Sequence, residues 1–220
     1  MSAFVALSCF QGRLQGWAFE ALASLAPDGI QLTPGNLPTE GLAAAVARSG
    51  LPTRTHQGFD PAARRGPVWD GPRCVADSDS VHAPPIAVEE FWERLGRERP
   101  SPALEVMYPG HHLGCGRDVL RAMDARLPLA VDVSHVHLQL AAGVMTPAQW
   151  ARLSDYDRIV EVHVSRDDGR HDVHQPIAPD TFGLAWARER SRDGLPVVLE
   201  CYMHRMSRAE AADQLGLLTT

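Results

Sequence analysis

The residues of this chain that could do chemistry are histidines and carboxylates that follow short apolar runs. The clearest example is the stretch RIVEVHVSRDDGRHDVHQPI, residues 158–177. Its β-branched residues predict a strand, and alternation along that strand places Glu161 and His163 on one face. The polar loop that follows carries Asp172 and His174. Because imidazole and carboxylate are the usual ligands of zinc, iron and manganese, the stretch predicts a metal site. The alternative is a solvated loop beside one core histidine.

Similar residues stand at the ends of other predicted strands. They are His56 in the run 52–59, Glu105 in 103–107, Asp132 and then His135 at the end of 129–133, and Glu200 in 196–201. In α/β barrels, the active site forms at the C-terminal ends of the strands. A buried cluster of Glu105, Asp132 and Glu200 would repel itself strongly without a cation. We therefore expect these side chains to meet in one metal-binding cluster.

The elements that must position these residues alternate between strand and helix along the chain. Strands are predicted at 4–9, 29–32, 52–59, 74–76, 103–107, 129–133, 159–164 and 196–201, and helices at 17–25, 40–48, 87–97, 117–125, 146–153, 179–190 and 207–215. The segment 60–85 is rich in Pro, Gly and Arg and is predicted to be mostly a long loop. Such alternation argues for an α/β fold, most simply a (β/α)8 TIM barrel formed by residues 1–220 as a single domain. A doubly wound open sheet is the alternative.

Composition limits the classes of partner. The chain has 220 residues, of which 45% are hydrophobic, which is enough for one large domain. Its net charge is −6, and all 21 basic side chains are Arg. The absence of Lys excludes Schiff-base chemistry, and an acidic chain without a basic run is a poor binder of nucleic acid. No apolar run reaches membrane-spanning length, the first ten residues lack a signal-peptide pattern, and the four cysteines show no paired spacing. We therefore expect a cytoplasmic protein that binds neither nucleic acid nor membrane.

Four short motifs resemble the metal-site strands of the xylose-isomerase-like TIM barrel superfamily, which includes sugar isomerases and epimerases and the endonuclease IV type of repair enzyme. They are Leu104-Glu105, Asp132-Val-Ser-His135, Glu161-Val-His163 and Leu199-Glu200. The resemblance to sugar epimerases implies one divalent metal ion held by Glu105, Asp132, His163 and Glu200. Asp132-x-x-His135 and Asp172-x-His174 are also similar to motifs that hold the further zinc ions of endonuclease IV, which adds His56 and His82 as candidate ligands.

Several stretches also look like the multinuclear non-haem iron oxidative enzymes, which modify peptides and small metabolites. They are Thr33-Pro-Gly-Asn36, Thr55-His56-Gln-Gly58, Asp132-Val-Ser-His-Val136, Glu161-Val-His163, Asp172-Val-His174-Gln-Pro176 and Leu199-Glu200. That resemblance implies two or more divalent transition metal ions, with iron expected first and manganese or zinc as alternatives. Those enzymes commonly carry Asn at the position of His135 and are usually longer.

These observations lead to one expectation and two alternatives. We expect a metal-dependent enzyme that acts oxidatively on a small metabolite or a peptide side chain, with Glu105, Glu200 and His135 in catalytic roles. The expected metal ligands are His56, His82, Glu105, Asp132, His135, His163, Asp172, His174 and Glu200. Arg166 is a candidate to bind an anionic group of the substrate, and His111 is a candidate substrate contact. The alternatives are a divalent-metal-dependent sugar or sugar phosphate isomerase or epimerase, and a barrel that only binds a ligand.

Overall fold

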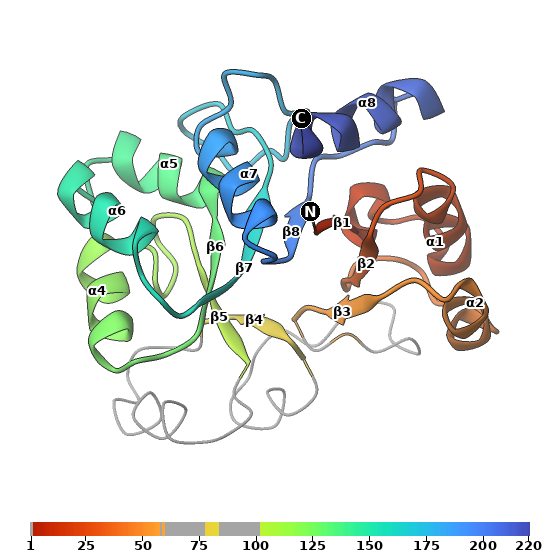
Figure 1. Ribbon diagram of the computed structural model, residues 1–220, viewed down its shortest axis with the longest axis horizontal. Helices are drawn as coiled ribbons and strands as arrows, with labels where there is room; N and C mark the ends of the chain where they lie inside the picture. The colour runs from red at the N-terminus through yellow and green to blue at the C-terminus, as the bar shows by residue number, and fades with distance from the viewer. Residues whose placement is uncertain (1, 58, 60–77, 84–101) are drawn as a thin grey trace.

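The computed structural model describes residues 2–57, 59, 78–83 and 102–220, and Figure 1 shows their arrangement. Eight parallel strands form one sheet in the order β3-β2-β1-β8-β7-β6-β5-β4. They are β1 (Ala3–Ala6), β2 (Gly29–Leu32), β3 (Thr53–Thr55), β4 (Ser80–His82), β5 (Ala103–Val106), β6 (Leu129–Asp132), β7 (Ile159–Val164) and β8 (Val197–Leu199). The first strand pairs with the last, and a parallel bridge between His56 and Ser80 joins the edges β3 and β4. The sheet therefore curls into a nearly closed barrel, which confirms the predicted (β/α)8 fold.

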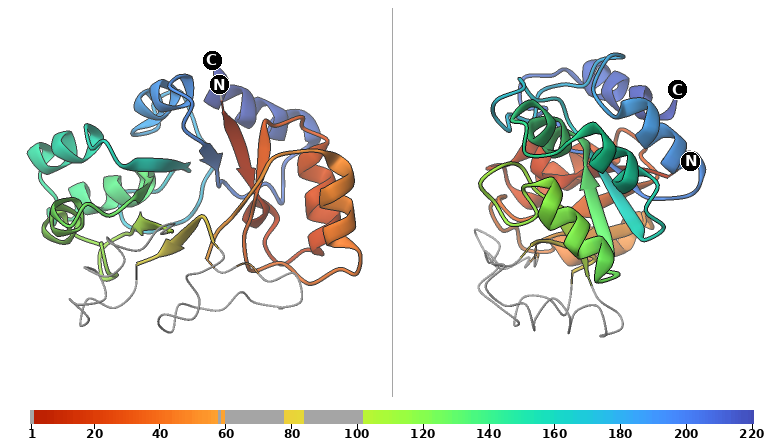
Figure 2. Two further views of the ribbon diagram at one scale, coloured as in Figure 1. Left: turned by 60° about the horizontal axis from the view of Figure 1, so that its bottom comes forward. Right: turned by 90° about the vertical axis from the view of Figure 1, so that its left-hand side faces the viewer.

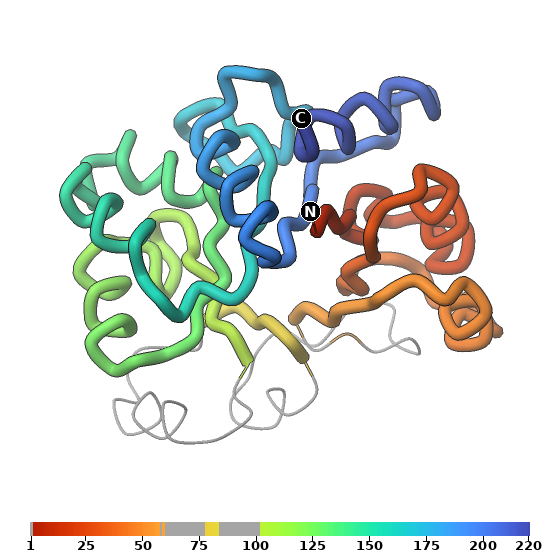
Figure 3. Tube along the Cα trace, viewed as in Figure 1, coloured from red at the N-terminus to blue at the C-terminus, as the bar shows by residue number. Residues whose placement is uncertain are grey.

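Helices lie on the outer side of the barrel (Figure 2). Those described are α1 (Gln15–Ala23), α2 (Leu42–Ser49), α4 (Gly116–Asp124), α5 (Val133–Ala141), α6 (Pro147–Ser154), α7 (Leu184–Arg192) and α8 (Arg208–Thr219). Capping boxes at Thr146 and Ser207 start α6 and α8 close to the predicted positions. The strand predicted at 4–9 ends at Ala6, because the chain turns there into a 3-10 helix, η1 (Leu7–Phe10). In Figure 3, the red first strand lies beside the blue last segments, as the pairing of β1 with β8 requires.

One helix that the sequence did not predict carries a candidate ligand. Helix α5 begins at Val133, directly after strand β6. The side chain of Asp132 caps it, because Asp132 Oδ1 accepts hydrogen bonds from the backbone N–H groups of Ser134 at 2.7 Å and His135 at 3.1 Å. The β-branched residues Val133 and Val136 favour an extended reading of this segment, which explains the error. As a consequence, His135 belongs to the first turn of a helix and not to a strand end.

The structure also changes the reading of the irregular segment 60–85. Strand β4, at Ser80–His82, lies within the part predicted as loop. The strand predicted at 74–76 and the helix predicted at 87–97 lie outside the described residues. Among the helices that the structure describes, none is both long and apolar enough to cross a membrane.

The interior of the barrel contains a polar layer. Gln31 on β2, Ser80 on β4 and Glu161 on β7 are completely buried, although these three strands are not neighbours in the sheet. Their side chains nevertheless lie within hydrogen-bonding distance, with Gln31 Nε2 at 2.9 Å from Glu161 Oε1. Contacts between non-adjacent strands can form only across the barrel axis. The polar layer therefore fills the interior beneath the C-terminal ends of the strands.

Candidate metal centre

Four side chains from the C-terminal ends of β5 to β8 meet at the mouth of the barrel. They are Glu105, Asp132, His163 and Glu200, all of them buried, and one donor atom of each lies within 4.8 Å of those of the others. His163 Nδ1 is 3.4 Å from Glu105 Oε1 and 3.6 Å from Glu200 Oε1. The structure thus brings together the four residues that the superfamily resemblance implies as ligands.

A second group of donors shares Glu105 with the first. Glu105 Oε2 lies 3.3 Å from His56 Nε2 and 3.2 Å from His82 Nε2. The other oxygen of this carboxylate lies 3.4 Å from Nδ1 of both His135 and His163. Glu105 therefore stands between two sets of imidazoles. A carboxylate in this position could serve two cations at the spacing of a two-metal site.

His135, Asp172 and His174 form a third group beside Asp132. Asp172 Oδ2 lies 3.3 Å from Nε2 of both His135 and His174, and His135 Nε2 lies 3.7 Å from Asp132 Oδ2. The loop after β7 delivers Asp172 and His174, and it holds His174 at a φ of 45°, which is in the left-handed region. Non-glycine residues in this region cluster at functional sites. His135 Nδ1 lies 3.0 Å from the carbonyl oxygen of Val106, so donation to that oxygen leaves Nε2 free for a cation.

The donor atoms of these groups fit a bound cation, because the protein gives them no hydrogen-bond partner. The buried atoms concerned are Glu105 Oε2, Asp132 Oδ2, His135 Nε2, His163 Nδ1, Asp172 Oδ1 and His174 Nδ1. A buried polar or charged atom without a partner costs free energy, and a cation among these atoms would remove that cost. The nitrogen and oxygen donors suit zinc, iron or manganese and do not choose among them.

The carboxylates of the cluster shift the pKa values of the histidines around them. Burial lowers the pKa of His135, but the charges of Asp132 and Asp172 outweigh burial and raise the pKa to about 10. Burial also opposes protonation of His174, whose hydrogen bond with Asp172 raises its pKa to about 9. Burial raises the pKa of the Glu200 carboxyl to about 7. Without a cation, both His135 and His174 are therefore protonated at neutral pH.

Cation binding is expected to release protons, because a metal ion and a proton compete for the same nitrogen atoms. At pH 7, a cation must displace the protons of His135 and His174, so metal affinity should rise as the pH rises towards their pKa values. Despite burial, the pKa of His163, another proposed ligand, is also raised well above its ordinary value, by the charge of Glu200 and by the hydrogen bonds with Glu105 and Glu161. Zinc added to metal-free protein in weakly buffered solution with an indicator dye should therefore release at least two protons per chain. Zinc uptake without proton release would show that these histidines do not bind the cation.

A cavity of about 250 Å³ opens onto these donors. Tyr108 and Tyr202 line it beside candidate ligands, with ring centroids 5.0 Å from that of His135 and 5.1 Å from that of His174, respectively. His111 lines the same cavity, with its ring 4.2 Å from that of Tyr108, so it lies where the predicted substrate contact must be. This volume suits a small molecule and is too small for a folded partner.

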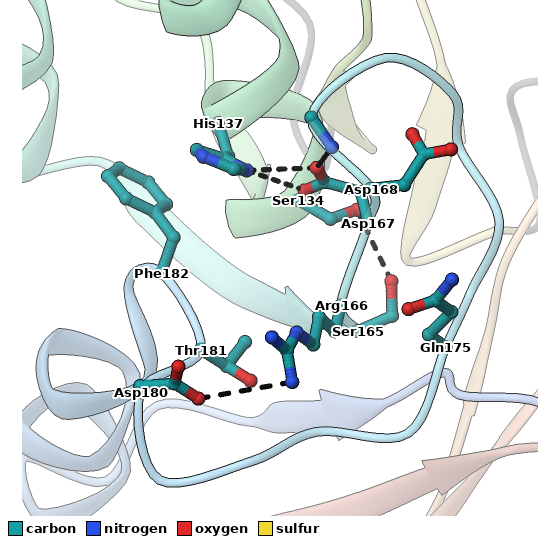
Figure 4. A pocket seen from close by; sticks show the side chains of 11 residues that line it. Ser134, His137, Ser165, Arg166, Asp167, Asp168, Gln175, Asp180, Thr181 and Phe182 are labelled. Atoms are coloured by element: carbon teal, nitrogen blue, oxygen red, sulfur yellow. Dashed lines mark hydrogen bonds and ion pairs between the residues drawn. The ribbon is translucent and has the colours of Figure 1, made fainter.

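Arg166 lies elsewhere, in a neighbouring cavity of about 370 Å³ (Figure 4). Its guanidinium is 3.9 Å from Asp180, and in the same cavity His137 Nδ1 lies 2.9 Å from Asp167 Oδ1 while the His137 ring stacks on Phe182. Side chains alternate along an extended chain, so Arg166 points away from the face that carries the candidate ligands. This position does not support the expectation that Arg166 holds a substrate anion at the metal centre.

Several buried residues that support the histidines through hydrogen bonds were not predicted from the sequence to be part of the site. Glu161 was placed on the face of His163, but the donors around it, Gln31, Ser80 and Arg54, were not foreseen. Burial raises the pKa of Glu161, but the hydrogen bond from His163 outweighs burial, and the pKa falls to about 2. The one signal in the sequence was Gln31, an amide side chain within an apolar strand. Such a residue needs a buried hydrogen-bond partner.

Comparison with known proteins finds similarity at the level of solved structures. No protein-family model matches this chain, and no curated protein matches it. Among solved structures, the chain is similar to a D-tagatose 3-epimerase-like protein, with a TM-score of 0.61 and 14% identity over 98% of this chain and 97% of that chain. At this identity the match shows the fold. It confirms the barrel architecture, and it does not bear on the resemblance to the iron oxidative enzymes.

Proposed function

We propose that this chain is a divalent-metal-dependent isomerase or epimerase that acts on a small sugar or sugar derivative. The observation that carries the proposal is the convergence of Glu105, Asp132, His163 and Glu200 beneath a small cavity at the barrel mouth. The fold shared with a D-tagatose 3-epimerase-like protein supports it. The small cavity, the net charge of −6 and the absence of Lys favour a small-molecule substrate over nucleic acid.

The proposed ligands Glu105, Asp132, His163 and Glu200 would hold a cation that polarises a substrate carbonyl and so acidifies the adjacent C–H group. Glu200 lines the cavity, and burial raises its pKa to about 7 in the cation-free protein. As a carboxylate that faces the cavity, it would accept and return the substrate proton. Burial would raise the pKa of Glu105 too, but His82 and His163 hold it well below the usual range, so Glu105 stays charged. Carboxyl groups whose pKa values are pushed apart can take different roles in one reaction.

A second function is favoured by the donors that one cation does not need. These are His56, His82, His135, Asp172 and His174, which all contact the four-residue cluster or one another. Several cations with open positions would suit a multinuclear iron enzyme that oxidises a small metabolite or a peptide side chain. The isomerase comes first here because its four ligands and the fold point in the same direction.

Isotope exchange separates the two functions. Protein loaded with manganese or iron, incubated with a panel of ketoses and aldoses in D2O without oxygen, should place deuterium on the carbon next to the carbonyl, as read by proton NMR. Oxygen consumption with a metabolite or peptide, and no exchange with any sugar, would refute the isomerase and support the oxidative enzyme.

A further inference from the structure

We infer that Glu161 is a positioning residue that lies behind the metal centre. It fixes the ring orientation of two proposed ligands, His56 and His163, and determines which nitrogen of each ring faces the cation. The inference rests on the proposed metal binding and deepens it. Glu161 lies on β7, two residues before His163 and on the same inward face, with no exposed surface. It therefore lies beneath the ligands, in the polar layer of the barrel interior.

The first link is direct. His163 Nε2 lies 2.7 Å from Glu161 Oε1, and a carboxylate can only accept, so Nε2 carries the hydrogen. The other ring nitrogen, Nδ1, is the buried atom without a hydrogen-bond partner that faces Glu105 and Glu200, so it is the nitrogen that a cation would bind. A carboxylate behind a histidine ligand commonly fixes the tautomer and the ring orientation in this way.

The second link runs through Ser80 on β4. The Ser80 hydroxyl donates its hydrogen to Glu161 Oε1, so its oxygen is left to accept from His56 Nδ1 at 3.0 Å. This order of donors leaves His56 Nε2 bare, 3.3 Å from Glu105 Oε2. The Glu161 carboxylate thus sets the tautomers of both His163 on β7 and His56 directly after β3. These two histidines contact different oxygens of Glu105.

Glu161 itself is not a ligand in this arrangement, although one of its oxygens lies within 4.8 Å of donor atoms of His56 and His163. Its Oε1 accepts hydrogen bonds from Ser80, His163 and Gln31, and its Oε2 accepts one from the Arg54 side chain. A carboxylate engaged by four donors has no free oxygen directed at a cation. In contrast, the Glu105 and Asp132 carboxylates each have a buried oxygen without such a partner.

Three variants test the inference by titration calorimetry with zinc on metal-free protein. Glu161→Ala should weaken zinc binding by about 10- to 100-fold, the loss typical when a group behind a ligand is removed. Ser80→Ala, which breaks only the link to His56, should cost less. Asp167→Asn is the matched control: it removes the charge of a buried carboxylate that pairs with His137 in the neighbouring cavity, and zinc affinity should not change. Thermal melting of each variant shows that it is folded.

A spectroscopic readout separates positioning from general stabilisation. In zinc-loaded wild-type protein labelled with 15N-histidine, NMR should show a hydrogen on Nε2 of His163 and on Nδ1 of His56. At saturating zinc, Glu161→Ala should retain the protein's fold and lose or shift these two N–H signals, while Glu161→Gln, which still has an accepting oxygen, should recover part of the affinity.

Two results would overturn this inference alone: wild-type zinc affinity with unchanged histidine signals in Glu161→Ala, or the loss of a whole equivalent of bound zinc in Glu161→Gln, which would make Glu161 a ligand. Wild-type protein that binds no cation would overturn the proposed function and this inference together.

Discussion

Glu105→Gln is expected to weaken divalent metal binding by more than about 100-fold, since removal of a central donor exceeds the loss typical of groups behind the ligands. Glu105 faces His56 and His82 with one oxygen and His135 and His163 with the other. The amide keeps the shape of the side chain but removes the charge that attracts the cations. Metal content after loading and desalting, measured by elemental analysis, checks the result.

The control for this variant is Asp118→Asn, which removes another buried carboxylate, on helix α4 outside the metal centre. It should load metal like the wild-type protein. Circular dichroism checks that both variants are folded. Against the effect of burial, His82 and His163 hold the pKa of Glu105 well below its usual range, so Glu105→Gln should lower the melting temperature of the cation-free protein. Full metal content in Glu105→Gln would show that the cations bind elsewhere on the chain.

Glu200→Gln should lower the rate of deuterium exchange into a sugar substrate by about 10²- to 10⁴-fold, the usual contribution of a general acid or base. Glu200 combines burial with a place in the lining of the cavity. Exchange is measured by NMR at saturating metal, so that weaker metal binding by the variant does not mimic the loss of a base. The matched change Arg166→Gln, in the neighbouring cavity, should leave the rate unchanged. Exchange at the wild-type rate in Glu200→Gln would remove Glu200 from the proposed chemistry.

The fold and much of the centre followed from one physical rule. In a parallel barrel the strands all end on the same side, so charged residues at the ends of apolar runs must approach one another. Glu105, Asp132, His163 and Glu200 were recognisable because each stands in such a place. Even the closing contact, between β3 and β4, involves a residue singled out from the sequence, His56.

Other parts of the centre depend on contacts that no local pattern reveals. The links from Gln31, Ser80 and Arg54 to Glu161 join strands that are distant in sequence and not adjacent in the sheet, so they exist only once the barrel has formed. His135 reaches the cluster from a helix whose start depends on the side chain of Asp132. The β propensity of Val133 predicts a strand at this position. The helix forms there because the Asp132 side chain caps it, and residue propensities do not reveal that contact.

The most direct test of the account is the metal content of the wild-type protein, purified without added metal and then again after loading with manganese, iron or zinc. The structure predicts that elemental analysis will find at least one equivalent of a divalent transition metal per chain after loading, and that a chelator will remove it with a fall in melting temperature, because a ligand that binds only the folded state stabilises it. A chain that takes up none of the three metals, and whose melting temperature does not change in their presence, would contradict the metal centre on which the proposed function depends.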